Sequence, residues 1–203
     1  MDQKSFLDKT LLPLLDECKR GVRDVYFIDA AHFVFGSFVC FLWCRTRQWV
    51  RAASGRQRHN VLGALHATNH WITTVINDTY ITAETVCILL RKLRAQAPPD
   101  RLITIVLDNA KYQTCDLVEK CAAECRIDLF FLPTYSPNLN LIERYWKYVK
   151  KTCLYGRYYA NFKDFHTAID TCILEAPIKD REKLNSLLAP NFQSFKNAQL
   201  YTA

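Results

Sequence analysis

The sequence predicts an α/β fold in which a mixed β-sheet is flanked by helices. Residues 22–76 contain apolar, β-branched runs with the character of a strand meander. After residue 80 the pattern changes to helix, strand, helix, strand and helix. Antiparallel strands followed by this alternation fit a mixed sheet flanked by helices. With 203 residues, the chain is long enough for one domain with a proper core.

Leucines and phenylalanines alternate with acids and lysines in the first twenty residues, which predicts an amphipathic helix. We divide the chain into this N-terminal segment (1–21), a central domain (22–176) and a C-terminal tail (177–203). The expected strands of the meander are 25–33, 38–45, about 49–53 and 71–76, with a polar turn at 54–58.

The second half contains the expected crossover elements. Expected helices cover 82–95, 114–125 and 162–174, and expected strands cover 103–107 and 127–131. Pro98-Pro99 separates the first of these helices from its strand. We expect the last helix to end before Pro177 because proline has no N–H to donate within a helix.

Three carboxylates stand in distinctive sequence frames. Asp29 and Asp108 directly follow apolar runs, so each is expected at the end of a buried strand. Ser136-Pro137 is typical of a helix start, and Glu143 lies within one or two turns of it. Apolar residues at 139, 142, 146, 149 and 153 form a stripe with helical spacing beside Glu143.

Converging carboxylates of this kind suit a divalent metal site. Mg²⁺ prefers oxygen ligands and is typically held by a few carboxylates together with water and substrate phosphate. Two such ions can activate a water and stabilise the leaving oxygen in phosphodiester cleavage. The alternative is that these are ordinary surface acids among the twenty Asp and Glu residues of the chain.

The motifs that contain these acids are F-I-D-A-A-H-F, V-L-D-N-A-K and S-P-N-L-N-L-I-E-R-Y-W, and thirty-four residues separate Asp108 from Glu143. They resemble the three acidic motifs of DDE-type (D-D-34-E) transposases of the mariner-like and bacterial insertion-sequence superfamily. The likeness spans roughly residues 22–175. The resemblance implies a ribonuclease H-like catalytic domain in which Asp29, Asp108 and Glu143 bind two Mg²⁺ ions, with Mn²⁺ as a substitute and Asp29 as the bridging ligand.

The chain departs from the family pattern at several positions. Ala30 stands where many relatives have Glu, Gln113 where many have His, and Leu141 where many have Pro. No role is assigned to Ala30 or Gln113. Asn109 is a candidate for orienting Asp108 or a bound water, with an ordinary turn role as the alternative.

The formal charge of +7 favours a polyanionic partner. Near Trp43 and Trp49 lie arginines that suit phosphate contacts and base stacking: Arg45, Arg47, Arg51, Arg56 and Arg58. Three lysines follow Glu143 on its helix, and Lys147 and Lys150 share its face, so DNA contact is expected from Lys147, Lys150 and Lys151. The alternative for both groups is a solvated basic surface.

Nine cysteines without a C-x₂-C pair, and no evident signal peptide, indicate reduced thiols in a cytosolic protein. The apolar stretch 33–43 is much shorter than the ~20 residues that a membrane-spanning helix requires. We therefore expect no membrane association and a bacterial cytoplasmic location at the nucleoid.

These patterns predict a transposase catalytic domain that cleaves double-stranded DNA at transposon ends and transfers strands to target DNA. The alternatives are a purely hydrolytic ribonuclease H-like nuclease, or a non-catalytic DNA-binding partner that regulates a full-length transposase. Joining two DNA ends makes a homodimer reasonable. Only 28 residues precede Asp29, so a separate helix-turn-helix polypeptide is a further expected partner.

Overall fold

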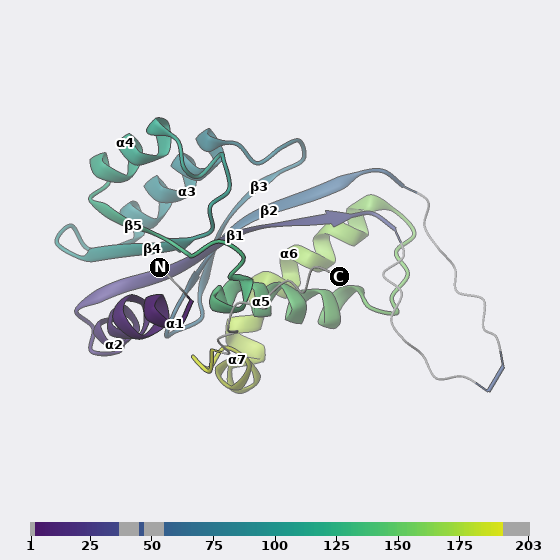
Figure 1. The fold of residues 1–203 in the computed structure, drawn as a ribbon. Coiled ribbons are helices and arrows are strands. Elements are labelled where there is room, and N and C mark those ends of the chain that lie inside the picture. Colours follow the sequence, from purple (N-terminus) through teal and green to yellow (C-terminus); the bar gives the residue numbers. More distant parts are fainter. Residues whose placement is uncertain (1–2, 37–44, 47–54, 193–203) are drawn as a thin grey trace, which may run out of the picture.

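The computed structural model describes residues 3–36, 45–46 and 55–192. At its centre is a five-stranded sheet with the order β3-β2-β1-β4-β5 (Figure 1). The strands are β1 (Arg23–Val34), β2 (Arg58–His66), β3 (Ile72–Asn77), β4 (Leu102–Leu107) and β5 (Ile127–Phe131). β2 pairs antiparallel with both β1 and β3, whereas β4 pairs parallel with β1 and β5. The predicted mixed sheet is confirmed.

Periodicity assigned no strand to β2, the most buried strand of the sheet, although residues 54–65 resemble the strand region between the first two acidic motifs of the transposase family. Residues 59–66 are all buried, so this strand lacks the alternation that marks a half-exposed strand. The strand expected at 49–53 lies outside the described residues. The one expected at 38–45 also does, except for Arg45, which lies in a bend. The other expected strands are present with small shifts at their ends.

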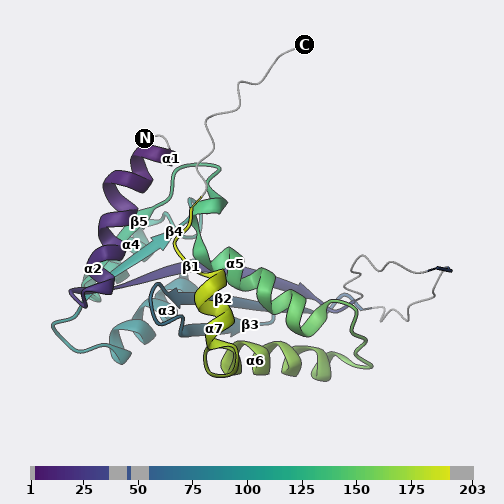
Figure 2. The ribbon, with the colours of Figure 1, turned by 90° about the horizontal axis from the view of Figure 1, so that it is seen from below.

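Helices cover both faces of the sheet (Figures 1 and 2). One face carries α3 (Ala83–Gln96) and α4 (Asp116–Glu124), whose buried residues share a core with Ile28 and Leu62. Thr82 caps α3 through a reciprocal bond with Thr85. The opposite face carries the N-terminal helix, α5 (Leu141–Val149), α6 (Phe162–Lys179) and α7 (Arg181–Leu187).

The N-terminal segment packs on the domain itself. It is one continuous helical stretch made of α1 (Gln3–Phe6), a π-helical turn (Leu7–Leu11) and α2 (Leu12–Lys19). Leu11 and Leu15 are buried in the same core as β1 and α5. The predicted amphipathic pattern therefore corresponds to burial within this chain.

Glu143 lies on a helix that has three parts. A 3₁₀ turn (Pro137–Leu139) precedes α5, and a π-helical turn (Lys150–Leu154) follows it. All members of the predicted apolar stripe at 139, 142, 146, 149 and 153 are buried. The stripe therefore fixes which side of α5 faces the sheet.

The expectation that the 162–174 helix ends before Pro177 is wrong, because α6 continues through Pro177 to Lys179. Proline cannot donate to the carbonyl four residues earlier, which is that of Ile173. The hydroxyl of Tyr145 donates to this carbonyl instead, at 2.9 Å. Tyr145 is fully buried, so α5 supplies the bond that α6 lacks.

All seven cysteines within the described ranges are free thiols, as predicted. Cys40 and Cys44 lie outside those ranges. None of the helices in the described part of the chain is both long and apolar enough to cross a membrane.

Replacing Tyr145 with Phe should lower the free energy of unfolding by about 1–3 kcal/mol, because the Ile173 carbonyl then has no donor in the core. The same substitution should cost clearly less in a Pro177→Ala background, because the backbone at position 177 then has an N–H that can donate to Ile173. Urea denaturation of the four proteins in this double-mutant cycle measures the difference. Equal costs in both backgrounds would contradict the proposed exchange of donors.

Candidate active site

The register between β1 and β4 brings two of the predicted acids together. Paired residues of these parallel strands, such as Phe27 and Val106, are separated by 79 positions in the sequence. Asp29 and Asp108 have the same separation, so they lie level just beyond the last paired residues. The apolar run before Asp29 suggested a strand end there, but the expected strand 25–33 already extended past Asp29, and β1 continues to Val34. It is β4 that ends, at Leu107.

Strand alternation decides which face of the sheet Asp29 occupies. Asp29 shares its face with Phe27 and Ala31, which are buried in the core beneath α5. Its neighbour across the β1–β2 ladder is Gly63. A Cβ at Gly63 would lie only 2.8 Å from the ring of Trp146, so the absent side chain makes room for α5 beside Asp29.

Asn140 connects the strand of Asp29 to the helix of Glu143. Its side-chain Nδ2 donates to the carbonyl of Ile28 at 3.2 Å, and its own carbonyl accepts from the Glu143 N–H at 3.2 Å. Asn140 is 4% exposed, and its Oδ1 is buried without a hydrogen-bond partner among the described residues. Asn140 therefore offers a free buried oxygen beside the acids.

A short turn orients Asp108 at the end of β4. The Ala110 N–H donates to Asp108 Oδ1 at 3.3 Å. Asn109 was considered for orienting Asp108 or a water, but its Nδ2 donates to the Leu132 carbonyl at 2.6 Å. Asn109 thus ties the Asp108 turn to the segment that follows β5.

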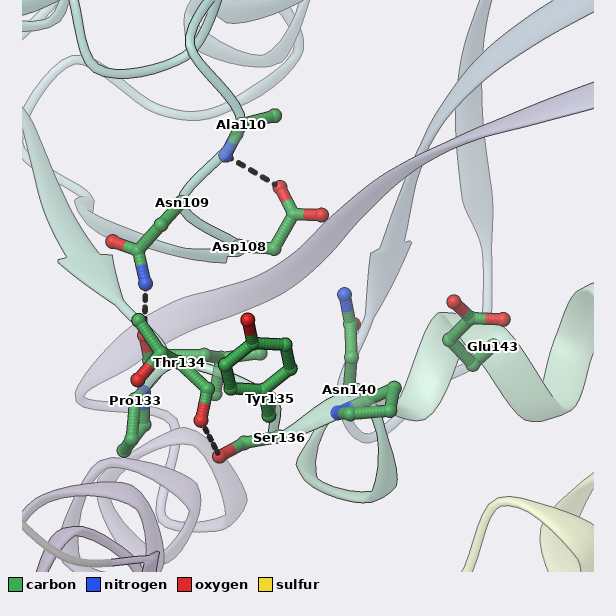
Figure 3. Close-up of a pocket in the computed structure, with 11 residues that line it drawn as sticks. Asp108, Asn109, Ala110, Pro133, Thr134, Tyr135, Ser136, Asn140 and Glu143 are labelled. Carbon is green, nitrogen blue, oxygen red and sulfur yellow. Dashed lines mark hydrogen bonds between the residues drawn. The ribbon is translucent and has the colours of Figure 1, made fainter.

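The two segments after β4 and β5 enclose a cavity of about 410 Å³ with the start of α5. In the view of Figure 3, Asp108 and Glu143 stand on opposite sides of this cavity, with Asn140 between them. The cavity is lined by Asp108, Asn109, Ala110, Leu132, Pro133, Thr134, Tyr135, Ser136, Pro137, Asn140 and Glu143.

The pKa of Asp29 depends on both of the other acids. Burial of its carboxyl, followed by the charges of Glu143 and Asp108, raises the pKa of Asp29 to about 7. The Ala30 N–H and the indole N–H of Trp146 oppose this rise. The indole N–H is buried and makes no well-aligned hydrogen bond to a described residue, so it is held near the carboxyl by packing.

Residues 24–166 match the family of DDE superfamily endonucleases. This match covers more than half of the chain and contains all three acids. The chain belongs to the DDE superfamily of endonucleases. A comparison with curated proteins finds no match.

Solved structures share the fold of this chain. The Mos1 strand transfer complex has a TM-score of 0.59 at 14% identity, over 93% of this chain and 61% of the Mos1 chain. A pre-cleavage Mos1 transpososome has a TM-score of 0.60 at 14% identity, over 93% of this chain and 62% of the Mos1 chain. The catalytic core domain of BIV integrase has a TM-score of 0.50 at 13% identity, over 76% of this chain and 84% of the integrase chain. The predicted ribonuclease H-like fold is confirmed, and the chain spans about three-fifths of the Mos1 chains.

The donor chemistry of the site fits divalent cations, as is typical of the family. Three carboxylates and the unpartnered Asn140 oxygen are hard ligands of the type that Mg²⁺ prefers. Burial, and then the charges of Glu143 and Asp108, raise the pKa of Asp29, and a bound cation would relieve the cost of ionising it. Across residues 3–36, 45–46 and 55–192, no three His, Cys, Asp or Glu side chains are close enough to hold one ion together. The charges of Glu143 and Asp108 thus act on Asp29, but the three side chains do not surround a single ion position.

The predicted DNA-binding residues fall into two groups. Lys147 is exposed and lines a second hollow together with Glu143 and Arg144, whereas Lys150 is half-buried and Lys151 exposed. Arg144 holds the end of the described chain by donating to the carbonyls of Ala189 and Asn191, both at 2.8 Å. Among the predicted arginines, the exposed ones are Arg45, Arg56 and Arg58, and those outside the described residues are Arg47 and Arg51.

The sequence analysis missed three residues of the site. Asn140 stands inside the third acidic motif, where only the acid was assigned a role, and Tyr135 stands directly before that motif. Tyr112 is also close, since burial, then the charges of Asp108 and Asp29, raise its pKa to about 12. The sequence carried no usable signal for Asn140, because the expected helix started at Ser136-Pro137 and the Asn140 side chain makes no cap hydrogen bond. Neither tyrosine carried a signal either.

In metal-free protein, Asp29 should make the fold less stable as the pH rises from about 4 to about 7. The folded state keeps its Asp29 proton up to about pH 7, whereas the unfolded chain loses it near its ordinary value, so ionisation favours unfolding. Asp29→Asn should therefore raise the melting temperature at pH 8 by at least about 2–4 °C and leave it nearly unchanged at pH 4. Calorimetry with a chelator present tests this, and an equal shift at both pH values would refute it.

Proposed function

We propose that the chain is the catalytic domain of a transposase, which cleaves DNA strands at transposon ends and joins the freed ends to target DNA. The observation that carries this proposal is the convergence of Asp29, Asp108 and Glu143 from β1, β4 and α5. Membership of the DDE endonuclease superfamily and the fold shared with Mos1 support it.

In this proposal Asp29, Asp108 and Glu143 would hold two Mg²⁺ ions, with Mn²⁺ as a substitute, and Asp29 would be shared between them. Two Mos1 mariner paired-end complexes were solved with Mn and Mg respectively. When bound, such ions lower the pKa of a water and stabilise developing charge on the leaving oxygen. Asn140 would keep Asp29 and Glu143 in register through its bond to the Ile28 carbonyl.

The proposed reaction has two in-line displacements at phosphorus. A water oxygen first attacks the phosphodiester at the transposon end, and the broken P–O bond leaves a 3′-hydroxyl. That hydroxyl then attacks a target phosphodiester, so one P–O bond forms as another breaks. No side chain becomes covalently attached to DNA in either displacement.

The two basic groups are proposed to hold double-stranded DNA. Lys147 lines the same hollow as Glu143, so a phosphate bound there lies near the acids. Lys150, Lys151, Arg45, Arg47, Arg56 and Arg58 would extend this contact along the strand. We further propose a homodimer acting on paired ends, a separate helix-turn-helix polypeptide as a further partner, and work at the bacterial nucleoid.

Asp108→Asn and Glu143→Gln should each reduce Mn²⁺-dependent nicking of a labelled duplex by at least about 100-fold, because each removes a ligand for the cations that stabilise the transition state. Asp100→Asn, which changes an exposed acid in a turn away from the site, is the matched control and should keep full activity. Denaturing gels resolve both nicked and joined strands.

The products separate the candidate functions. Strand joining by the wild type would establish a transposase, and nicking without joining under all target conditions would identify a hydrolytic nuclease of the same fold. Activity that survives in both acid variants, or absence of activity in the wild type with paired transposon ends and either metal, would overturn the proposal.

Lys147→Glu should weaken duplex binding and reduce the dependence of the logarithm of the affinity on the logarithm of salt by about 0.9, the value for one phosphate contact. Lys120→Glu makes the same charge change on α4, which covers the opposite face of the sheet, and is the control. Fluorescence anisotropy at several salt concentrations measures both slopes. Equal slopes for the two variants would show that Lys147 does not contact a DNA phosphate.

A further inference from the structure

Tyr135 is a large aromatic side chain that the protein leaves almost wholly in solvent. Its exposed fraction is 96%, although it lines the same cavity as Asp108 and Glu143. In Figure 3 the hydroxyl end of its ring points to the side of the cavity where Asp108 lies. The ring therefore gains little from packing within the chain, and its flat face is available at the site.

The backbone at Tyr135 is in the left-handed region, with φ of 58°. A residue with a Cβ is strained there, whereas glycine adopts this conformation freely. Strained backbone of this kind tends to occur at ligand and catalytic sites. Since the exposed ring returns little packing energy, folding alone gives no reason for a tyrosine at this position.

The loop around Tyr135 is nevertheless held firmly. The side chain of Gln3 donates to the Tyr135 carbonyl at 3.1 Å and accepts from Asn138 Nδ2 at 3.2 Å. The Ser136 hydroxyl donates to the Thr134 carbonyl at 3.3 Å. The N-terminal helix thus clamps the loop on both sides of Pro137, and the ring is presented in a fixed place.

We infer that Tyr135 is a stacking platform for an unpaired nucleobase next to the phosphodiester that the three acids hold. This inference rests on the proposed function, since it needs DNA in the site. An aromatic face binds any base by stacking, and such contacts do not depend on sequence. Because Tyr135, Asp108 and Glu143 line one cavity, a nucleotide with its phosphate at Asp108 would have its base within reach of the ring.

Stacking on Tyr135 requires a base that has left the duplex. A base at a frayed end or beside a nick is unpaired at small cost, whereas an internal paired base must first be extruded. The platform would therefore favour DNA that is already open near the scissile bond. Tyr135 is in this sense a residue that selects the structural state of the substrate.

The test uses a short duplex with a single-stranded overhang whose 2-aminopurine is bright in the free DNA, in Ca²⁺, with gels to verify that the DNA stays uncut. Wild type and Tyr135→Phe should quench this fluorescence on binding, because both carry the ring. Tyr135→Gly should not quench it, and its affinity for the overhang should fall by roughly tenfold, within the range for one stacked base. Its affinity for the blunt, fully paired duplex should stay unchanged.

The melting temperature separates stacking from a structural role. Tyr135→Gly removes the strain of the left-handed backbone, so its melting temperature should equal or exceed that of the wild type. If Tyr135 instead stabilised the fold, its replacement would lower the melting temperature. Quenching by Tyr135→Gly equal to that of the wild type, or an equal loss of affinity for overhang and blunt DNA, would overturn the inference.

Failure of this inference is distinguishable from failure of the proposed function. If the wild type cleaves DNA but does not quench the 2-aminopurine, the platform is refuted while the catalytic assignment stands. If Tyr135→Gly loses self-association instead of overhang binding, the ring belongs to an interface between copies of the chain and the platform is likewise refuted. If the wild type quenches the base but cleaves nothing, the inference stands and the catalytic proposal falls.

Discussion

The site depends on one feature of the sheet, the unequal length of two adjacent parallel strands. β4 ends at Leu107 while β1 continues, so the polar residues at the end of β4 lie beside a strand that is still extended. Because the pairing offset is constant along the ladder, it places Asp108 level with Asp29. Neither carboxylate needs an unusual backbone to reach the other, and the geometry of ordinary strand pairing brings them together.

The third acid depends on how α5 is fixed over the same face. Its buried stripe faces the core, Trp146 fills the space left by Gly63, and Asn140 bonds to the strand directly before Asp29. On its far side α5 is joined to α6 by the bond from Tyr145 to the carbonyl that Pro177 leaves unpaired. None of these contacts is made by the acids themselves. The packing around the acids therefore holds them near one another despite their like charges.

This arrangement has an electrostatic consequence. Bringing Asp29 out of water beside Glu143 and Asp108 raises its pKa to about 7, which is a measure of how unfavourable the ionised site is by itself. A site that is unfavourable when empty and rich in oxygen donors gains free energy when a cation binds. By holding the acids together, the packing of β1 and α5 thereby favours the state with a bound cation over the empty site.

The sequence by itself determined most of the elements and singled out the three acids as candidates. Apolar runs before Asp29 and Asp108, and the helical stripe beside Glu143, depend on local periodicity, and local periodicity is visible in one dimension. It could not give β2, whose residues are buried on both faces and show no alternation, nor the continuation of α6 through Pro177, which requires a hydroxyl from another helix. The tertiary structure alone decided that Asp29 lies level with Asp108, that Asn140 spans from β1 to α5, and that Tyr135 stands exposed at the cavity. Each of these outcomes depends on strand register or on contacts between segments distant in the chain. No local sequence pattern indicates them.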